Sequence, residues 1–464
     1  MSKEVVDLLL VGARVFTDGG LVDASVGVKD GEIAFISSRH WAPPAAKTVD
    51  LTGKLLLPGF VDTHVHFRDP GLTYKEDFLT GTRAAAAGGF TCVVDMPNNK
   101  PALLTRERFR NKRDDVGTRA IVDFALYAGA TNLPEIPGML EEGAIGVKIF
   151  MVSDPKSHYP HDPELFTGDD GVLYDTLTIA RDHGAYCAVH PTNQQIFTHE
   201  SRKRWAAGTT GPKDFMAAYF GENFVGDHTS ISTLIAMSEA AKARTHILHV
   251  RTEQSIRMIH QAHEEGTPVT MEINPKYMLL GEEDMAALGP LSTPYGLPAT
   301  QRAKLLEYVK KGWVDVLATD HAPHTRDELA PGWKDAWSIP FGNPQLDHAS
   351  AILLTRVNEG VLTLESLVKV LCENPARLIG VYPRKGAIRA GADADLVVVD
   401  MNRKGVLNDE ECQTKVGWSP YSGKAFHGRA VMTISRGDIV MEEGKVAATP
   451  GRGRFIPGPT RKPT

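Results

Sequence analysis

The stretch Leu57-Pro58-Gly59-Phe60-Val61-Asp62-Thr63-His64-Val65-His66 is an apolar run that ends in two histidines. In an extended strand the residues at i and i+2 point to the same face, so His64 and His66 place two imidazoles side by side. Paired imidazoles are suitable ligands for zinc and neighbouring divalent metals. The stretch therefore predicts a buried strand that carries two metal ligands at its carboxyl end.

Seven further apolar runs follow this one, and helical segments separate them. The runs are rich in Val, Ile, Leu and Phe at both alternating positions, as expected of parallel strands buried on both faces. Eight such βα units predict an α/β fold of the (βα)8 TIM-barrel type. A doubly wound open sheet is the alternative, but the Gly-rich phosphate turn that it needs after the first strand is missing. The predicted strands are Leu55–Phe67, Phe90–Met96, Ile121–Ala128, Ala144–Val152, Ala185–His190, His246–Val250, Pro268–Ile273 and Val314–Asp320, and the predicted helices include Glu76–Ala87, Ile231–Ala243, Ser255–Glu265 and Gln301–Lys311.

Both ends of the sequence consist of short strand-like runs joined by turn residues. Because the two groups are distant in sequence and have no other strands to pair with, we expect them to fold together. They predict a small β-sandwich domain made by residues 1–56 and 386–450, beside a TIM-barrel domain at residues 57–385. The segment 451–464 is rich in Pro, Gly and Arg and predicts a flexible tail. The expected terminal strands are Val5–Phe16, Ala24–Lys29, Ile33–Ser37, Asp395–Asp400, Val431–Ser435 and Ile439–Glu442.

Polar residues close several of the predicted barrel strands. His190, His249 and Asp320 end the fifth, sixth and eighth runs, and Lys148 lies inside the fourth. In a TIM barrel the functional side chains gather at the carboxyl ends of the strands. A single histidine at such a place has an ordinary structural explanation, but a repeated pattern of imidazole and carboxylate groups indicates a metal site.

Lys148 has two interpretations. Its ammonium group can extend along the strand and reach the surface, as lysine side chains often do. Alternatively, burial and neighbouring cations depress its pKa. A neutral amine can take up CO2 to form a carbamate, whose two oxygens can bridge two metal ions. In that arrangement the metals acidify a water and polarise a carbonyl, and Asp320 can carry the proton to a leaving nitrogen.

Composition excludes several other classes of function. The net charge is −6, which gives no basic field for nucleic acid. No apolar run is long enough to span a membrane, and the expected location is the cytoplasm. The four cysteines form no CxxC pair, which argues against a cysteine zinc site or a disulfide framework; they are Cys92, Cys187, Cys372 and Cys412.

These residues together resemble the binuclear site of the amidohydrolase superfamily, in particular the cyclic amidohydrolases: dihydroorotase, allantoinase and hydantoinase. The resemblance covers nearly the whole sequence and includes the motifs at residues 57–62 and 386–395. It implies that His64 and His66 bind one metal ion and that His190 and His249 bind a second. It also implies that carboxylated Lys148 bridges the two ions, most often Zn2+, and that Asp320 is both ligand and proton carrier. Relatives form homodimers and homotetramers, so self-association is expected.

The expected substrate is a small cyclic amide, and different motifs favour different members of that class. His64-Val-His66-Phe-Arg68-Asp-Pro-Gly71 resembles dihydroorotase, in which the arginine holds the substrate carboxylate. The asparagine and second histidine that match Asn98 and His324 share this role there, so a carboxylate-bearing substrate is the leading hypothesis. Residues 146–152 and 328–337 instead resemble allantoinase and hydantoinase. Four departures from the usual patterns keep an uncommon cyclic amide or imide open. They are Ser153, Pro191-Thr192-Asn193, Asn274-Pro275-Lys276-Tyr277 and Pro294-Tyr295-Gly296-Leu297.

Two other functions compete with this one. A ring deaminase of the same superfamily usually keeps one metal ion and lacks the lysine of the fourth strand. A non-catalytic scaffold similar to the dihydropyrimidinase-related proteins would have lost ligands, whereas all six are present in this sequence.

Overall fold

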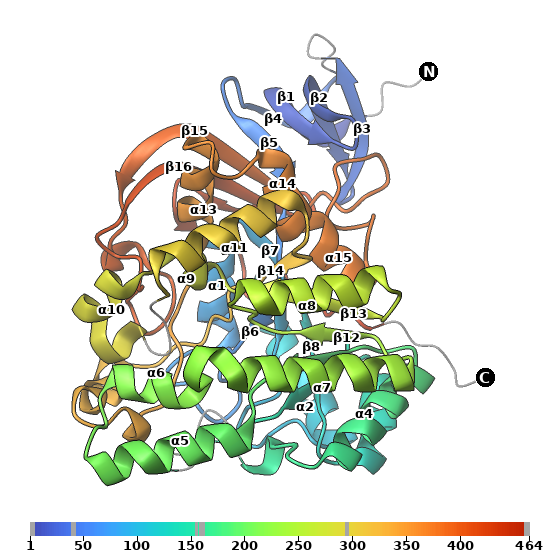
Figure 1. The fold of residues 1–464 in the computed structure, drawn as a ribbon. Coiled ribbons are helices and arrows are strands. Elements are labelled where there is room, and N and C mark those ends of the chain that lie inside the picture. Colours follow the sequence, from blue (N-terminus) through green and yellow to red (C-terminus); the bar gives the residue numbers. More distant parts are fainter. Residues whose placement is uncertain (1–4, 39–42, 154–155, 157–162, 293–296, 459–464) are drawn as a thin grey trace.

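The computed structural model describes residues 5–38, 43–153, 156, 163–292 and 297–458. Its core contains two sheets of parallel strands, flanked by helices, and a third sheet built from both ends of the chain (Figure 1). The chain is thus an α/β protein with parallel sheets.

The first parallel sheet has the strand order β6-β7-β8, and the second has the order β14-β13-β12-β11-β10-β9. The two sheets meet at both edges. Only Tyr127 separates β8 from β9, and a parallel bridge joins Val65 of β6 to His321, which follows β14. The strands are β6 (Phe60–Val65), β7 (Phe90–Asp95), β8 (Asp123–Leu126), β9 (Ala128–Gly129), β10 (Val147–Phe150), β11 (Cys187–His190), β12 (Thr245–Ile247), β13 (Val269–Ile273) and β14 (Val316–Leu317).

Helices connect these strands and pack on their outer side (Figure 1). In α8, Ile256, Ile259 and Ala262 are buried at helical spacing, and Thr252 caps the first turn by accepting the backbone N–H of Ser255. The helices are α1 (Phe78–Ala87), α2 (Arg106–Gly117), α3 (Ile136–Glu141), α4 (Asp170–Asp182), α5 (Gln194–Ala207), α6 (Pro212–Phe220), α7 (Val225–Ala241), α8 (Glu253–Glu264), α9 (Pro275–Leu279), α10 (Glu282–Leu288), α11 (Ala299–Lys311), α12 (Arg326–Leu329), α13 (Ala349–Asn358), α14 (Leu364–Val368) and α15 (Asn374–Leu378).

The third sheet, which we call the terminal sheet, has nine strands and joins the two ends of the sequence. The N-terminal and C-terminal groups meet where β5 pairs with β1 on one side and with β15 on the other. The expected pairing of the two chain ends is therefore present. The strands are β1 (Val6–Thr17), β2 (Gly20–Lys29), β3 (Glu32–Ser38), β4 (Ala45–Asp50), β5 (Leu55–Pro58), β15 (Leu396–Val406), β16 (Ala425–Ser435), β17 (Asp438–Glu442) and β18 (Lys445–Val446).

The run predicted as one strand at Leu55–Phe67 is in fact two strands in different sheets. The chain changes sheets at Gly59, whose N–H donates to Asp395 O while the next residue, Phe60, donates to Gly89 O. A Cβ at Gly59 would lie 2.3 Å from the Thr91 hydroxyl, so only glycine fits this crossing. The stretch at residues 57–66 therefore links the terminal sheet to the first parallel strand.

The prediction of a flexible tail at 451–464 is wrong for its first part. The Phe455 side chain packs on Phe124 of β8, and Ile456 is buried. The backbone N–H of Arg454 donates to Asp123 at 2.9 Å. These apolar and backbone contacts outweigh the Pro- and Gly-rich composition. Residues 459–464 lie outside the described part of the chain.

A buried ion network holds the parallel strands, the terminal sheet and this C-terminal segment together. The Nζ of Lys385 is 2.7 Å from Asp123 Oδ2 and 2.9 Å from Asp393 Oδ2, and it also contacts Asp395. Asp123 lies at the start of β8 and pairs with Arg436, in the turn after β16, at 3.1 Å. Although burial disfavours the ammonium form, the surrounding carboxylates raise the pKa of Lys385 above its usual value.

Replacing Lys385 with methionine is expected to lower the free energy of unfolding by about 3–5 kcal/mol, because it leaves buried carboxylates without their cation. Urea unfolding followed by circular dichroism measures this change. Lys203→Met is the matched control: it removes an exposed pair with Glu200 on α5 and should cost less than about 1 kcal/mol. Equal effects of the two substitutions would contradict a stabilising role for the network.

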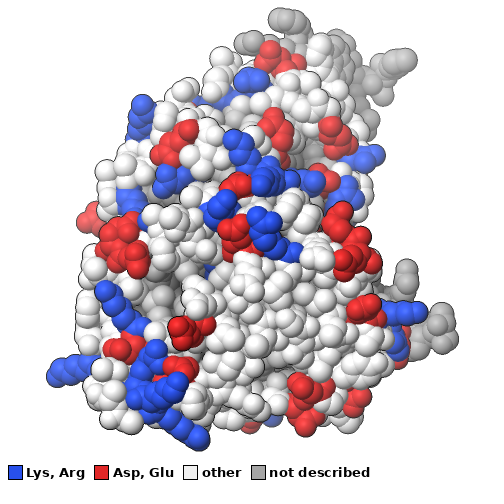
Figure 2. All heavy atoms as spheres, viewed as in Figure 1, with Lys and Arg blue, Asp and Glu red and all other residues white. Residues whose placement is uncertain are grey.

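Charged side chains of both signs lie beside one another on the face of the molecule shown in Figure 2. The lower centre of this view, over α7, carries few charges. Among the described residues, none of the helices combines the length and the apolar composition needed to cross a lipid bilayer.

Candidate metal centre

The six side chains predicted as metal ligands all line one cavity. They come from the carboxyl ends of the parallel strands: His64 and His66 from the end of β6, Lys148 from β10 and His190 from β11. His249 and Asp320 follow β12 and β14. The remaining lining residues are Arg68, Asn98, Phe150, Tyr219, Arg251, Tyr277, Ala322, Phe341 and Gly342.

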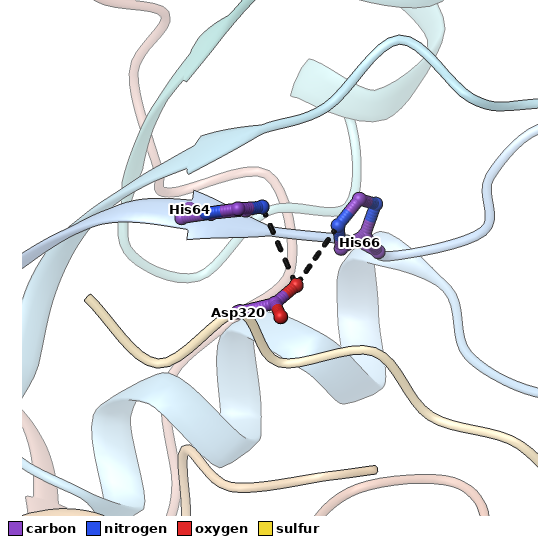
Figure 3. A group of neighbouring side chains, drawn as sticks. All are labelled: His64, His66 and Asp320. Atoms are coloured by element: carbon purple, nitrogen blue, oxygen red, sulfur yellow. Dashed lines mark ion pairs between the residues drawn. The ribbon is translucent and has the colours of Figure 1, made fainter. Parts of the chain in front are cut away.

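His64, His66 and Asp320 form a compact group in this cavity. Asp320 Oδ1 is 3.3 Å from His64 Nε2 and 3.2 Å from His66 Nε2. Figure 3 shows both imidazoles directed at the same carboxylate from the strand end. One donor atom from each residue lies within 4.8 Å of the others, a separation that a single divalent ion can span. These three residues are a candidate ligand set.

Contacts of the second ring nitrogen, Nδ1, fix the orientation of both histidines. His64 Nδ1 is 2.6 Å from Glu272 Oε1, and His66 Nδ1 is 2.6 Å from Asn98 Oδ1. Because an oxygen acceptor requires a proton on Nδ1, Nε2 is the nitrogen of each ring that faces the cavity. Metal-binding histidines in proteins are usually held in this way. Glu272 is ionised: burial raises its pKa, but His64 and His246 outweigh this and lower it to about 2.

His190 and His249 form the second group. His249 Nε2 lies 2.8 Å from His190 Nδ1, and the other ring nitrogen of His190 contacts the Tyr219 hydroxyl. Burial, followed by the charge of Arg251, lowers the pKa of His249 well below its usual value, so its imidazole is neutral. Two imidazoles with converging nitrogens are again suited to a divalent cation.

Backbone conformation helps to aim two of these side chains. His249 has φ +39° and Asp320 has φ +51°, a region that residues other than glycine rarely adopt. Both lie where the chain turns away from a parallel strand. Strained backbone of this kind is concentrated at functional sites, where the surrounding structure enforces it.

Lys148 is completely buried on β10, and its Nζ has no hydrogen-bond partner among the described residues. The interpretation in which its ammonium reaches the surface is therefore wrong. Burial lowers the pKa of Lys148 to about 7, which makes the neutral amine abundant near neutral pH. A buried amine that contacts the Phe150 ring, 4.6 Å from Nζ, in a cavity lined by histidines, is suited to forming a carbamate.

The three residues predicted to contact substrate occupy different positions. Arg68 lines the cavity, and its guanidinium is 3.0 Å from His324 Nε2. His324 does not line the cavity. It lies between Arg68 and Lys75, with its Nδ1 3.0 Å from Lys75 Nζ, and contacts Arg68 on the side away from the cavity. Asn98 lines the cavity while its Oδ1 binds His66.

Several residues in or beside the cavity have no role predicted from the sequence. Lys276 Nζ is 3.3 Å from Asp320 Oδ2. Burial opposes ionisation of Asp320, but Lys276 and His64 hold the pKa of that carboxyl well below its usual range. Arg251 pairs with buried Asp227 at 2.9 Å beside the second histidine group. The sequence offered one signal for each of two such residues. Arg251 is a charged residue just after the predicted ligand His249, and Glu272 is a charged residue inside an apolar run.

The departures from the usual sequence patterns have local structural roles. The Thr192 hydroxyl donates to Tyr219 at 3.2 Å, and Asn193 caps α5 by accepting the backbone N–H of Ile196. The backbone N–H of Ser153 donates to the Gln194 side chain at 2.7 Å. In the departure at residues 294–297, Pro294-Tyr295-Gly296 lies outside the described residues.

Comparison with known proteins agrees with this arrangement. The model of the amidohydrolase family matches residues 55–440. A dihydroorotase of Methanothermobacter thermautotrophicus is 32% identical over 97% of this chain and 97% of its own length. An allantoinase of Deinococcus radiodurans is also 32% identical, over 97% of this chain and 98% of its own. The solved structure of the L-hydantoinase (dihydropyrimidinase) from Arthrobacter aurescens superposes with a TM-score of 0.93 at 33% identity, covering 98% of this chain and 100% of that one.

The family match spans most of the chain, and the relatives align over nearly their whole length. The protein therefore belongs to the amidohydrolase family, in the group of cyclic amidohydrolases.

Proposed function

We propose that this protein hydrolyses the endocyclic amide C–N bond of a small nitrogen heterocycle. The observation that carries the proposal is the convergence of His64, His66, Lys148, His190, His249 and Asp320 on one cavity. The relatives are named for hydantoin, dihydroorotate and allantoin, which are all cyclic amides. Fold and metal ligands are shared among such enzymes, so the choice of ring must come from the other cavity residues.

The two parallel sheets form, in this proposal, one closed (βα)8 barrel. Two observations support this closure: only Tyr127 separates β8 from β9, and a bridge joins Val65 to His321. When β8 and β9 are counted as one barrel strand, the ring has eight strands. The terminal sheet folds over itself into a β-sandwich, supported by a separate apolar cluster that includes Leu10, Val26 and Val398. The proposed domains are residues 59–385 for the barrel and 1–58 with 386–450 for the sandwich, because β5 ends at Pro58 and belongs to the terminal sheet.

The imidazole and carboxylate donors of the centre suit two divalent ions such as Zn2+. His64 and His66 would hold one ion, His190 and His249 would hold the other, and carboxylated Lys148 and Asp320 would supply the shared ligands. The buried Nζ of Lys148, which has no hydrogen-bond partner among the described residues, supports the carbamate. When bound, the ion pair lowers the pKa of a water and polarises the substrate carbonyl.

Asp320 moves the proton in this scheme. Its carboxylate faces the cavity between the two histidines of β6 and Lys276. It accepts the proton of the attacking water and delivers it to the ring nitrogen as the C–N bond breaks. The aromatic rings of Phe150, Tyr219 and Tyr277 line the cavity and limit the access of bulk water.

Arg68 selects a substrate that bears a carboxylate, as in dihydroorotase. Its buried guanidinium suits a two-point contact with a carboxylate, with the Asn98 amide as a second contact and His324 setting its direction. The alternative is a neutral ring, as in allantoin or a hydantoin. The comparable identity of this chain to all three kinds of relative favours neither.

A panel of cyclic amides tests both the reaction and the role of Arg68. The panel contains dihydroorotate, allantoin, hydantoins, dihydrouracil and succinimide, offered to zinc-loaded protein. We expect the carboxylate-bearing ring to be preferred. Arg68→Met should lower kcat/KM for that ring by about 10- to 100-fold, the effect of losing a charged hydrogen bond, while dihydrouracil turnover changes little.

Arg110→Met, an exposed substitution on α2, is the control for that experiment and should leave the preference unchanged. Hydrolysis of none of the rings would contradict the proposed reaction. Hydrolysis without any preference for the acidic ring would contradict the role of Arg68 alone.

Self-association into a homodimer or homotetramer is part of the proposal. The outward residues of α7 include Ser232, Ala236 and Ala240, and the face above it carries few charges (Figure 2). Such a surface suits contact with a second copy of the chain. Analytical ultracentrifugation should give a multiple of 50.5 kDa, and a mass of one chain at micromolar concentration would contradict this part.

A further inference from the structure

Glu272 on β13 lies between the two groups of predicted ligands. It is completely buried, and its Oε1 accepts two hydrogen bonds. One comes from the His64 ring at 2.6 Å, and the other comes from the backbone N–H of His249 at 3.3 Å. One carboxylate oxygen thus contacts a ligand from each half of the site.

The other side of this carboxylate is braced by His246 of β12. Its Nε2 lies 3.5 Å from Glu272 Oε2, and its Nδ1 is 2.8 Å from the Thr270 hydroxyl. His246 is itself fully buried. Glu272 is therefore held by hydrogen bonds through Oε1, while Oε2 has only the ion-pair contact with His246 in the described structure.

The charge of Glu272 is only partly compensated. Within the described residues, its close ion pairs are with His64 and His246, and Lys148 and Lys276 act on it at longer range. A buried carboxylate whose charge is only partly compensated is costly. Divalent cations on the far side of the His64 ring would supply the missing positive charge.

Glu272 also contacts the strained part of the backbone. His249 has φ +39°, and its N–H is the one that Glu272 accepts. Strain of this kind persists only where neighbouring groups enforce it. The contact therefore helps to keep the His249 side chain directed into the cavity.

We propose that Glu272 is a positioning residue that aligns His64 and His249 together and thereby couples the two metal sites. The inference rests on the proposed metal centre. Glu272 holds the proton of His64 on Nδ1 and increases the basicity of Nε2, while it fixes the backbone from which His249 extends. Both binding steps should therefore depend on this one carboxylate.

Glu272→Gln tests the proposal through metal affinity. The amide removes the charge and most of the basicity conferred on His64, and the loss of such an outer contact lowers metal affinity by about 10- to 100-fold. Zn2+ dissociation constants are measured by competition with a chromophoric chelator, and the Co2+-substituted protein gives a visible spectrum that reports ligand geometry. We expect both dissociation constants to rise and the Co2+ spectrum to change.

Asp315→Asn is the matched control. It is also a carboxylate-to-amide change against β13, since Asp315 Oδ2 accepts the Met271 N–H at 2.8 Å, but it lies away from the cavity. It should leave both the affinities and the spectrum unchanged. Glu272→Asp, which keeps the charge and shortens the side chain, provides the same measurement if the glutamine variant does not fold, and its affinities should fall in the same direction.

Unchanged affinity at either step in Glu272→Gln, or an equal loss in Asp315→Asn, would overturn the coupling role. A wild-type protein that binds no metal would instead overturn the proposed function itself. The two failures are therefore distinguishable.

Discussion

Replacing Lys148 with alanine is expected to reduce turnover more than about 100-fold and to lower the metal content of the purified protein. The loss of an outer contact alone costs about 10- to 100-fold, and the removal of a bridging ligand should exceed it. Lys148 is completely buried, and its Nζ lines the cavity that the histidines share. Turnover on the preferred ring and metal per chain by mass spectrometry are the two measurements.

Lys311→Ala, an exposed change on α11, serves as the comparison for Lys148→Ala and should retain both metal and turnover. Circular dichroism establishes that both variants are folded. If Lys148→Ala kept its full metal content and turnover, the bridging carbamate would be refuted.

Replacing Asp320 with alanine is expected to lower kcat by about 10²- to 10⁴-fold, the usual contribution of a positioned proton carrier. The substitution leaves the other five predicted ligands in place, so most of the metal should remain bound. Asp320 Oδ1 faces the two histidines of β6, and this geometry puts the carboxylate beside the reacting atoms (Figure 3). Steady-state kinetics with metal analysis separates the two roles of Asp320.

The matched change is Asp182→Ala at the exposed end of α4, where the carboxylate pairs with neighbouring Arg181. It should behave as the wild type does. Undiminished turnover in Asp320→Ala would refute the proton-carrying role, and loss of all metal would assign Asp320 to metal binding alone.

The positions of the parallel strands were predictable because their apolar runs are buried on both faces and are bounded by polar ends. The boundary at Gly59 was not predictable, because the sequence shows one apolar run there. The structure divides this run between two sheets, with Leu55–Pro58 in one and Phe60–Val65 in the other. The C-terminal segment was also mispredicted. Its composition gave no sign that Phe455 packs against Phe124.

The candidate site shows a similar division. Residues at strand ends were accessible to sequence reasoning, because parallel strands bring their carboxyl ends together. Tyr219 was not, because it lies on α6 and no spacing relates it to His190, which it contacts. Positive φ values at His249 and Asp320 likewise depend on tertiary contacts and leave no mark in the sequence.

The most direct test of the central claim is the metal content of the protein purified without added metal and measured by inductively coupled plasma mass spectrometry. We predict two tightly bound divalent ions per chain. One ion per chain would favour a ring deaminase, and protein that holds no divalent metal would contradict the account.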